Sequence, residues 1–107
     1  IELMLFLSLP LDGKDVVEKI SMGERVLRIW PSSEVISRQA IFLAIAGRRD
    51  AADALLSRGM KSSKSQRTKI AAIVAEAPPA ARAVLDHVIQ SATRTRSAPE
   101  RTTVPRH

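Results

Sequence analysis

The densest run of charge in this sequence lies between residues 57 and 69, where basic side chains stand among serines with no acidic residue between them. The basic members are Arg58, Lys61, Lys64, Arg67 and Lys69. Ammonium and guanidinium groups attract phosphates and carboxylates, so such a run can contact phospholipid headgroups, nucleic acid or an acidic protein. A solvated loop is the more common role of a charge run. We treat these five residues as candidate partner-binding residues and keep the solvated loop as the alternative.

The overall charge is concentrated in the same half of the chain. The net charge is +6; residues 1–50 hold seven basic and seven acidic side chains, and residues 51–107 hold ten and four. Nucleic acid is still a poor candidate partner, because Phe6, Trp30 and Phe42 stand at positions expected in the core and leave no aromatic platform for bases. An anionic lipid surface or a protein partner fits this sequence better.

A second polar feature is the pair Arg38-Gln39, at the midpoint of a segment that is otherwise apolar. The pair is a candidate for contact with a partner. The alternative is structural, with Arg38 forming an ion pair between helices with Glu18, Glu24 or Asp50. We favour this ion pair over contact with a ligand.

Catalytic and metal chemistry find little support in the sequence. Cysteine is absent, which excludes disulfides, thiol nucleophiles and thiolate-bound metals. His87 and His107 are the only histidines, and they lack the paired spacing of metal ligands. Asp86 and His87 are neighbours on a predicted helix and point in different directions, which suits a surface histidine better than an acid–base pair. We therefore assign no catalytic residue, no metal ligand and no cofactor.

The elements that would position these residues are helices. Residues 33–46 predict a helix that is apolar on more than one side and therefore has several neighbours. Gly47 supplies the left-handed conformation that ends a helix, and the short loop requires the next helix, from about residue 51, to lie antiparallel. Small residues at Ala40 and Ala52 let the two backbones approach. This spacing resembles one tetratricopeptide-type hairpin.

Further helices are expected on both sides of this hairpin. One runs from Asp15 to Trp30, with Trp30 on its buried face and Lys19 facing water, and it ends because Pro31 follows. Others cover residues 65–76 and 80–92, and residues 1–9 form a buried helix or an extended lead-in. The sequence predicts an all-α fold, a short stack of antiparallel helix hairpins of about five helices. Residues 1–92 form this domain, and residues 93–107 a disordered basic tail.

The run from Arg25 to Ala52 also resembles the C-terminal domain of a bacterial membrane-bound family of O-antigen-polymerase-like and ligase-like enzymes, which includes the pilin O-oligosaccharyltransferases. The shared pattern is a helix ending near a proline, then an Arg-Gln-Ala helix, then Ala-x-Gly-Arg and an Ala-rich helix. The likeness covers roughly Leu7 to Leu56. Beyond Met60 the family usually has an aromatic-Pro connection, which this sequence replaces with residues 61–67.

The resemblance implies a non-catalytic interaction or regulatory module of a polysaccharide polymerase or O-oligosaccharyltransferase, whose membrane part transfers glycan from a lipid carrier. The start at Ile1 rather than Met agrees with a segment of a longer protein. The parent would belong to the bacterial inner membrane, on a side that the sequence does not fix, and the isolated domain would be soluble. The alternative is an independent tetratricopeptide-like adaptor that binds a peptide or a partner helix.

Overall fold

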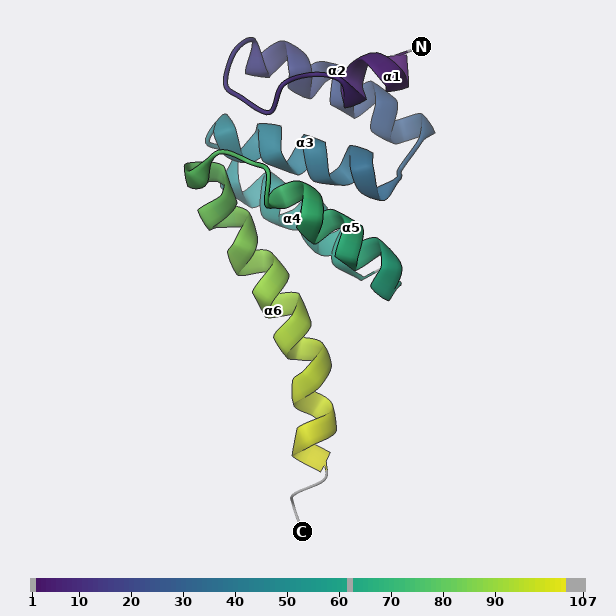
Figure 1. The fold of residues 1–107 in the computed structure, drawn as a ribbon, viewed down its shortest axis with the longest axis vertical. Helices are drawn as coiled ribbons and strands as arrows, with labels where there is room; N and C mark the ends of the chain where they lie inside the picture. The colour runs from purple at the N-terminus through teal and green to yellow at the C-terminus, as the bar shows by residue number, and fades with distance from the viewer. Residues whose placement is uncertain (1, 62, 104–107) are drawn as a thin grey trace.

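The computed structural model describes residues 2–61 and 63–103, with side chains described for 3–61 and 63–91. This part of the chain is helical and contains no strand, so the predicted all-α class is confirmed (Figure 1). The helices are α1 (Glu2–Leu7), α2 (Val16–Ile29), α3 (Ser33–Ile45), α4 (Arg49–Met60), α5 (Lys64–Val74) and α6 (Pro79–Thr103).

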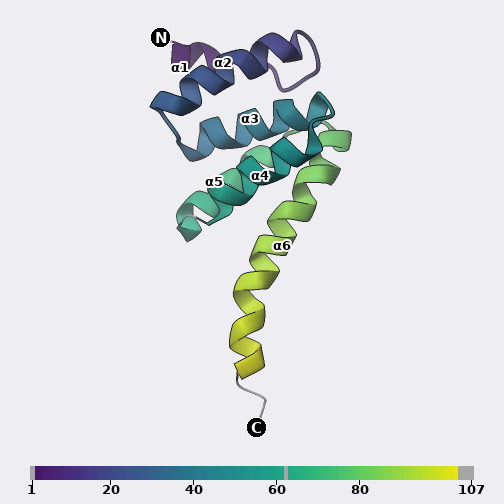
Figure 2. The same cartoon turned by 180° about the vertical axis from the view of Figure 1, so that it is seen from behind.

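Helix α3 is the centre of the stack, and it packs against each of the other five helices. Its side chains Ile41, Phe42 and Leu43 are consecutive and all buried, as a helix with neighbours on several sides requires. Helices α1 and α2 cover one side of α3, and α4, α5 and the first part of α6 cover the other side in both views (Figure 1, Figure 2). The prediction of a helix with more than one packed face is confirmed.

The hairpin of α3 and α4 turns where the sequence predicts. Gly47 has φ +84°, and the Arg48 amide donates to the Leu43 carbonyl at 2.8 Å, which closes the end of α3. Ala40 and Ala52 are fully buried. A Cβ added at Gly59 near the end of α4 would lie 2.9 Å from Cγ2 of Ile36 at the start of α3, which shows that the helices are antiparallel and closely packed.

The N-terminal layer is fixed to α3 through aromatic packing. Phe6 of α1 and Phe42 of α3 are both buried, and their rings meet edge to face with centroids 5.7 Å apart. Helix α2 ends at Ile29, two residues before Pro31. The Ser32 side chain then accepts a hydrogen bond from the Val35 amide at 3.3 Å and caps α3. The lead-in is therefore a short helix with one side chain in the core.

Trp30 is not a core residue, which corrects the sequence prediction. The periodic buried face of α2 stops one turn earlier, because Trp30 precedes a proline and leaves helical geometry, with φ −128° and ψ 81°. Its side chain is 42 % exposed. Pro31 does end the helix as predicted, and this same restriction is what turns the indole away from the core.

Lys19 does not face water, which is a second correction. It is only 7 % exposed, because the loop between α1 and α2 folds over it. Its ammonium donates to Oδ1 of Asp12 at 2.7 Å and to the Pro10 carbonyl at 3.0 Å, and it lies 5.4 Å from the centroid of the Phe42 ring. Helical periodicity assigns faces to one helix alone and gives no sign of a loop that covers a charge.

The last helix is longer than predicted. We expected α6 to end near residue 92 and a disordered tail to follow, whereas α6 continues to Thr103 and residues 104–107 lie outside the described part. The packed first half of α6 supplies the nucleus, and each further residue then adds a backbone hydrogen bond without needing an apolar face. Loss of apolar periodicity therefore marks where packing ends rather than where the helix ends.

Candidate interaction surface

Arg38 and Gln39 lie inside the fold rather than on a surface. Gln39 is 2 % exposed, and its Nε2 donates to the Ile20 carbonyl of α2 at 3.0 Å. Arg38 is half-buried, and its Nη1 donates to the Leu9 carbonyl at 3.3 Å. Both side chains therefore join α3 to the N-terminal layer.

The contacts of Arg38 and Gln39 correct our structural interpretation in one respect. The link between helices is present, but the acceptors are backbone carbonyls rather than the carboxylates of Glu18, Glu24 or Asp50. A carbonyl is an acceptor at every position of the chain, so the sequence does not reveal which one is used. With Gln39 almost fully buried, this residue cannot contact a partner in the folded chain.

An ion pair does form between Lys19 and Asp12. The pKa of the Asp12 carboxyl is lowered from its usual 3.8, first by the hydrogen bond from Lys19 and then by the one from the Lys14 amide. Both interactions favour the ionised carboxylate. This pair holds the loop between α1 and α2 on the stack and is a structural feature.

The basic run surrounds the turn between α4 and α5. Arg58, Lys61, Lys64 and Lys69 are exposed, whereas Arg67 is half-buried. The Ser63 hydroxyl accepts from the Gln66 amide at 3.3 Å and caps α5, so this serine of the run has a local structural role. Four of the five basic side chains are therefore exposed. Three of these, Arg58, Lys61 and Lys64, stand at the end of α4 and the beginning of α5.

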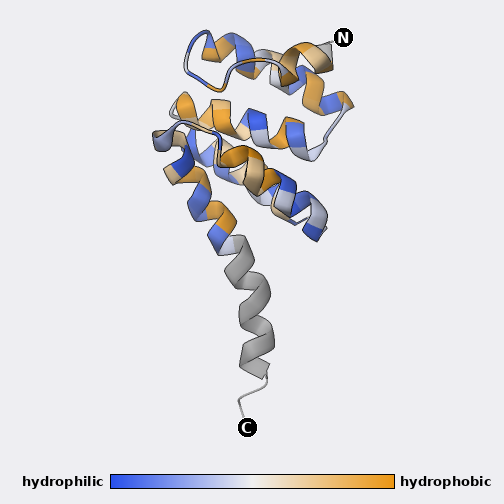
Figure 3. Ribbon diagram, viewed as in Figure 1, coloured by the Kyte–Doolittle hydropathy of each residue, from blue (hydrophilic) through white to orange (hydrophobic). Residues whose placement is uncertain are grey.

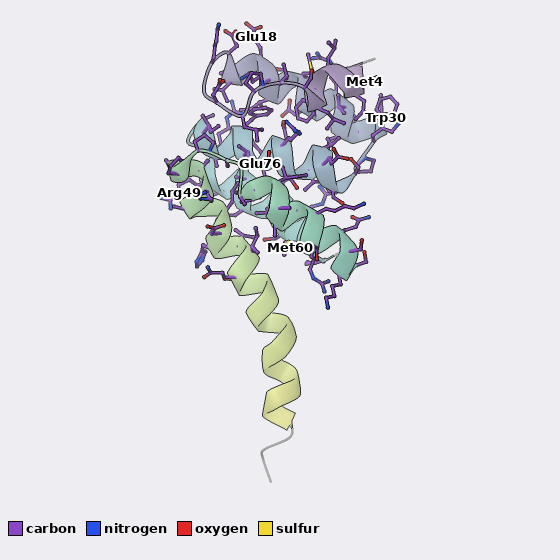
Figure 4. The ribbon with its side chains drawn as sticks, viewed as in Figure 1. Met4, Glu18, Trp30, Arg49, Met60 and Glu76 are labelled. Carbon is purple, nitrogen blue, oxygen red and sulfur yellow. The ribbon has the colours of Figure 1, made fainter. Side chains whose placement is uncertain are left out.

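The antiparallel order of the helices gives the stack two ends of different composition. The C-terminal ends of α2 and α4 and the N-terminal ends of α3 and α5 meet at one end, which we call the Trp30 end. The opposite end, called the Arg49 end, holds the beginnings of α2 and α4. Figure 4 labels Met4 and Trp30 on the side of the Trp30 end, and Glu18 and Arg49 towards the other.

Large apolar side chains are exposed at the Trp30 end, and the sequence analysis did not identify them. Besides Trp30 they are Ile29 at 62 %, Met4 at 75 % and Leu5 at 52 % exposed. Helix α1 packs on α2 with these residues outward, and Figure 3 shows hydrophobic residues along α1 and the last turns of α2. The available signal was the apolar character of residues 1–9, which is greater than one buried face of a short helix can use.

Comparisons with protein-family models, with curated proteins and with solved structures found no match to this chain. None of the described helices is both long and apolar enough to cross a lipid bilayer. The described residues also contain no cluster of His, Asp and Glu side chains able to hold a metal ion. The exposed cations and apolar side chains of the Trp30 end make up the candidate site.

Proposed function

We propose that this chain is the C-terminal interaction module of a membrane-bound polysaccharide polymerase or O-oligosaccharyltransferase. In this proposal the membrane part of the parent protein transfers glycan from a lipid carrier, and the helical stack contacts that part or a partner protein. The chain itself carries out no chemistry.

The observation that carries the proposal is the structural role of the residues that make up the resemblance. Gly47 has the left-handed conformation at the α3–α4 turn, and Ala40 and Ala52 lie buried in that hairpin. Arg38 and Gln39 connect the hairpin to the layer before it. Each of these residues of the shared pattern has its own structural role in this fold. Such a pattern arises by chance less often than a mere likeness in helix composition, which supports common descent with the resembled domain.

The reading frame upstream of Ile1 tests the proposal directly. We expect it to encode about a dozen apolar spans of roughly 20 residues each, as a polytopic membrane enzyme requires. A reading frame that starts close to Ile1 would refute the proposal and leave the adaptor that binds a peptide or partner helix.

A reconstitution experiment tests the division of labour. The upstream membrane part and residues 1–107 are produced as two polypeptides and purified together through a tag on one of them. We expect co-purification, and glycan transfer by preparations that contain the membrane part. Transfer by residues 1–107 alone would contradict a non-catalytic module, and failure to co-purify would contradict an interaction with the membrane part.

A further inference from the structure

The Trp30 end combines two features that the sequence keeps far apart. Four of the five large hydrophobic side chains that the described surface exposes are Met4, Leu5, Ile29 and Trp30. Arg58, Lys61 and Lys64 are exposed at the same end, since α3 lies antiparallel to both α2 and α4. The fold therefore brings an indole, three aliphatic or thioether side chains and a group of cations to one end of the stack, with the apolar group on the α2 side of α3 and the cations on the α4 and α5 side. Figure 1 and Figure 2 show α2 and α4 ending at this end, and Figure 4 labels Met4 and Trp30 there.

The Arg49 end has a different composition. Its charges have both signs, with Lys14, Glu18 and Arg49 all exposed. Val17 is the only large hydrophobic side chain exposed there among the described residues. The apolar and cationic character is therefore a property of one end and not of the whole surface.

We propose that the Trp30 end binds the surface of a bilayer that contains anionic phospholipids. Trp30, Ile29 and Met4 enter the headgroup region, where an indole is favoured because its ring is apolar and its N–H is polar. Lys61, Lys64 and Arg58 contact lipid phosphates. Glu34, in the first turn of α3, is an acidic side chain at this end, and the exposed cations Arg58, Lys61 and Lys64 outnumber it among the described side chains.

Charge complementarity selects an anionic bilayer over other occupants of the apolar patch. A second copy of this chain would bring two positively charged ends together, which opposes association. Each cation close to an anionic membrane raises the binding constant roughly fivefold. Burial of apolar side chains adds a contribution to binding that does not depend on salt. Neither the cations nor the apolar side chains bind a membrane strongly alone. A surface that has both binds a membrane stably, as in peripheral membrane proteins. The inference concerns residues 1–107 themselves and does not depend on the proposed parent protein.

Trp30 makes the proposal directly measurable, because it is the only tryptophan and the chain has no tyrosine. Residues 1–107 are titrated with vesicles of phosphatidylcholine alone and with vesicles of equimolar phosphatidylcholine and phosphatidylglycerol. We expect the emission of Trp30 to shift to the blue and to be quenched by brominated acyl chains with the anionic vesicles. An unchanged emission at low salt would overturn the proposal.

Matched variants separate this end from a general effect of positive charge. Lys61→Gln with Lys64→Gln is compared with Lys14→Gln with Arg49→Gln, which removes the same charge from the opposite end. We expect the first pair to weaken binding by roughly 10- to 25-fold at physiological salt and the second by a few fold at most, because attraction fades there within a Debye length of about 8 Å. Equal losses would refute a specific docking end.

The apolar contribution has its own pair of variants. Ile29→Ser with Met4→Ser keeps the Trp30 reporter, and Val17→Ser is the exposed control on the same helix layer. We expect the first variant to reduce the salt-resistant part of binding at least tenfold and the control to leave it unchanged. Light scattering gives the molar mass without lipid. A dimer whose formation shifts the Trp30 emission would assign the patch to a second copy and overturn lipid binding.

Discussion

Substitution of Gly23 by Ala tests the packing that joins the N-terminal layer to α3. A Cβ at this position would lie 1.8 Å from Oε1 of Gln39, 2.6 Å from its Cδ and 2.9 Å from Cε1 of Phe6. The Gln39 amide is at the end of a flexible side chain, but it is almost fully buried and bonded to the Ile20 carbonyl. It therefore cannot move aside without losing that bond or displacing its neighbours.

The expected loss of stability follows from three opposing contributions. Overpacking costs about 1 to 3 kcal/mol, and a buried amide left without its partner costs about 1 to 3 kcal/mol more. The higher helix propensity of Ala returns about 1 kcal/mol. The net destabilisation is about 1 to 5 kcal/mol, measured by urea denaturation followed by far-ultraviolet circular dichroism. Glu24→Ala, on the exposed face of α2, is the control and should stay within about 0.5 kcal/mol.

A double-mutant cycle decides whether Gln39 is the cause. In a Gln39→Ala background the contacts with the amide are gone and the contact with Phe6 remains, so Gly23→Ala should cost less, with a coupling energy above about 1 kcal/mol. The same cost in both backgrounds would refute the contact. A stabilising effect of Gly23→Ala alone would refute the close approach of α2 and α3.

Three further predictions concern turns, core and pH. Gly47→Val should destabilise by more than about 1 kcal/mol, because a β-branched residue is strained at φ +84° although no atom lies within 4 Å of the new Cβ; an unchanged melting temperature would contradict this. Leu43→Ala should cost about 2 to 5 kcal/mol and Arg49→Ala at most about 0.5 in the same urea assay, and equal costs would contradict the buried face of α3. The pKa of Asp12 is lower in the folded chain, so its contribution is present above its usual pKa of 3.8 and is lost as the pH falls through the folded value. In thermal melts at decreasing pH, the melting temperature of the parent should fall more steeply in acid than that of Asp12→Asn. Parallel falls would exclude the Asp12–Lys19 pair as a source of this pH dependence.

Local signals in the sequence were sufficient for the central helices and the turn between α3 and α4, although not for the end of α6. Pro31 and Gly47 each act on the backbone of their own neighbourhood, and Ala40 and Ala52 follow helical spacing. These effects depend on a few adjacent residues, so they could be predicted without the fold. The class and the order of the hairpins follow from them.

The surface of the Trp30 end could not be predicted in this way. Periodicity placed Trp30 in the core, since it continues the apolar face of α2, whereas the proline after it changes its backbone conformation. Which helix ends meet depends on the antiparallel order of the whole stack. The basic run was visible in the sequence, but its neighbourhood with Ile29 and Met4 depends on contacts between α1, α2, α3 and α4.

The pair Arg38-Gln39 connects the fold to the proposed surface. These side chains of α3 donate to carbonyls of residues 9 and 20, so they hold the layer that carries Met4 and Trp30 on α3, against which α4 and α5 with the basic run also pack. Helices α4 and α5, which carry the basic run, pack on α3, on α6 and on each other, and not on α1 or α2. Loss of both donors therefore weakens the attachment of the apolar patch before it weakens the basic turn. Because membrane binding by the Trp30 end requires both parts in one orientation, a polar pair buried in the stack determines whether the outer surface can act as a unit.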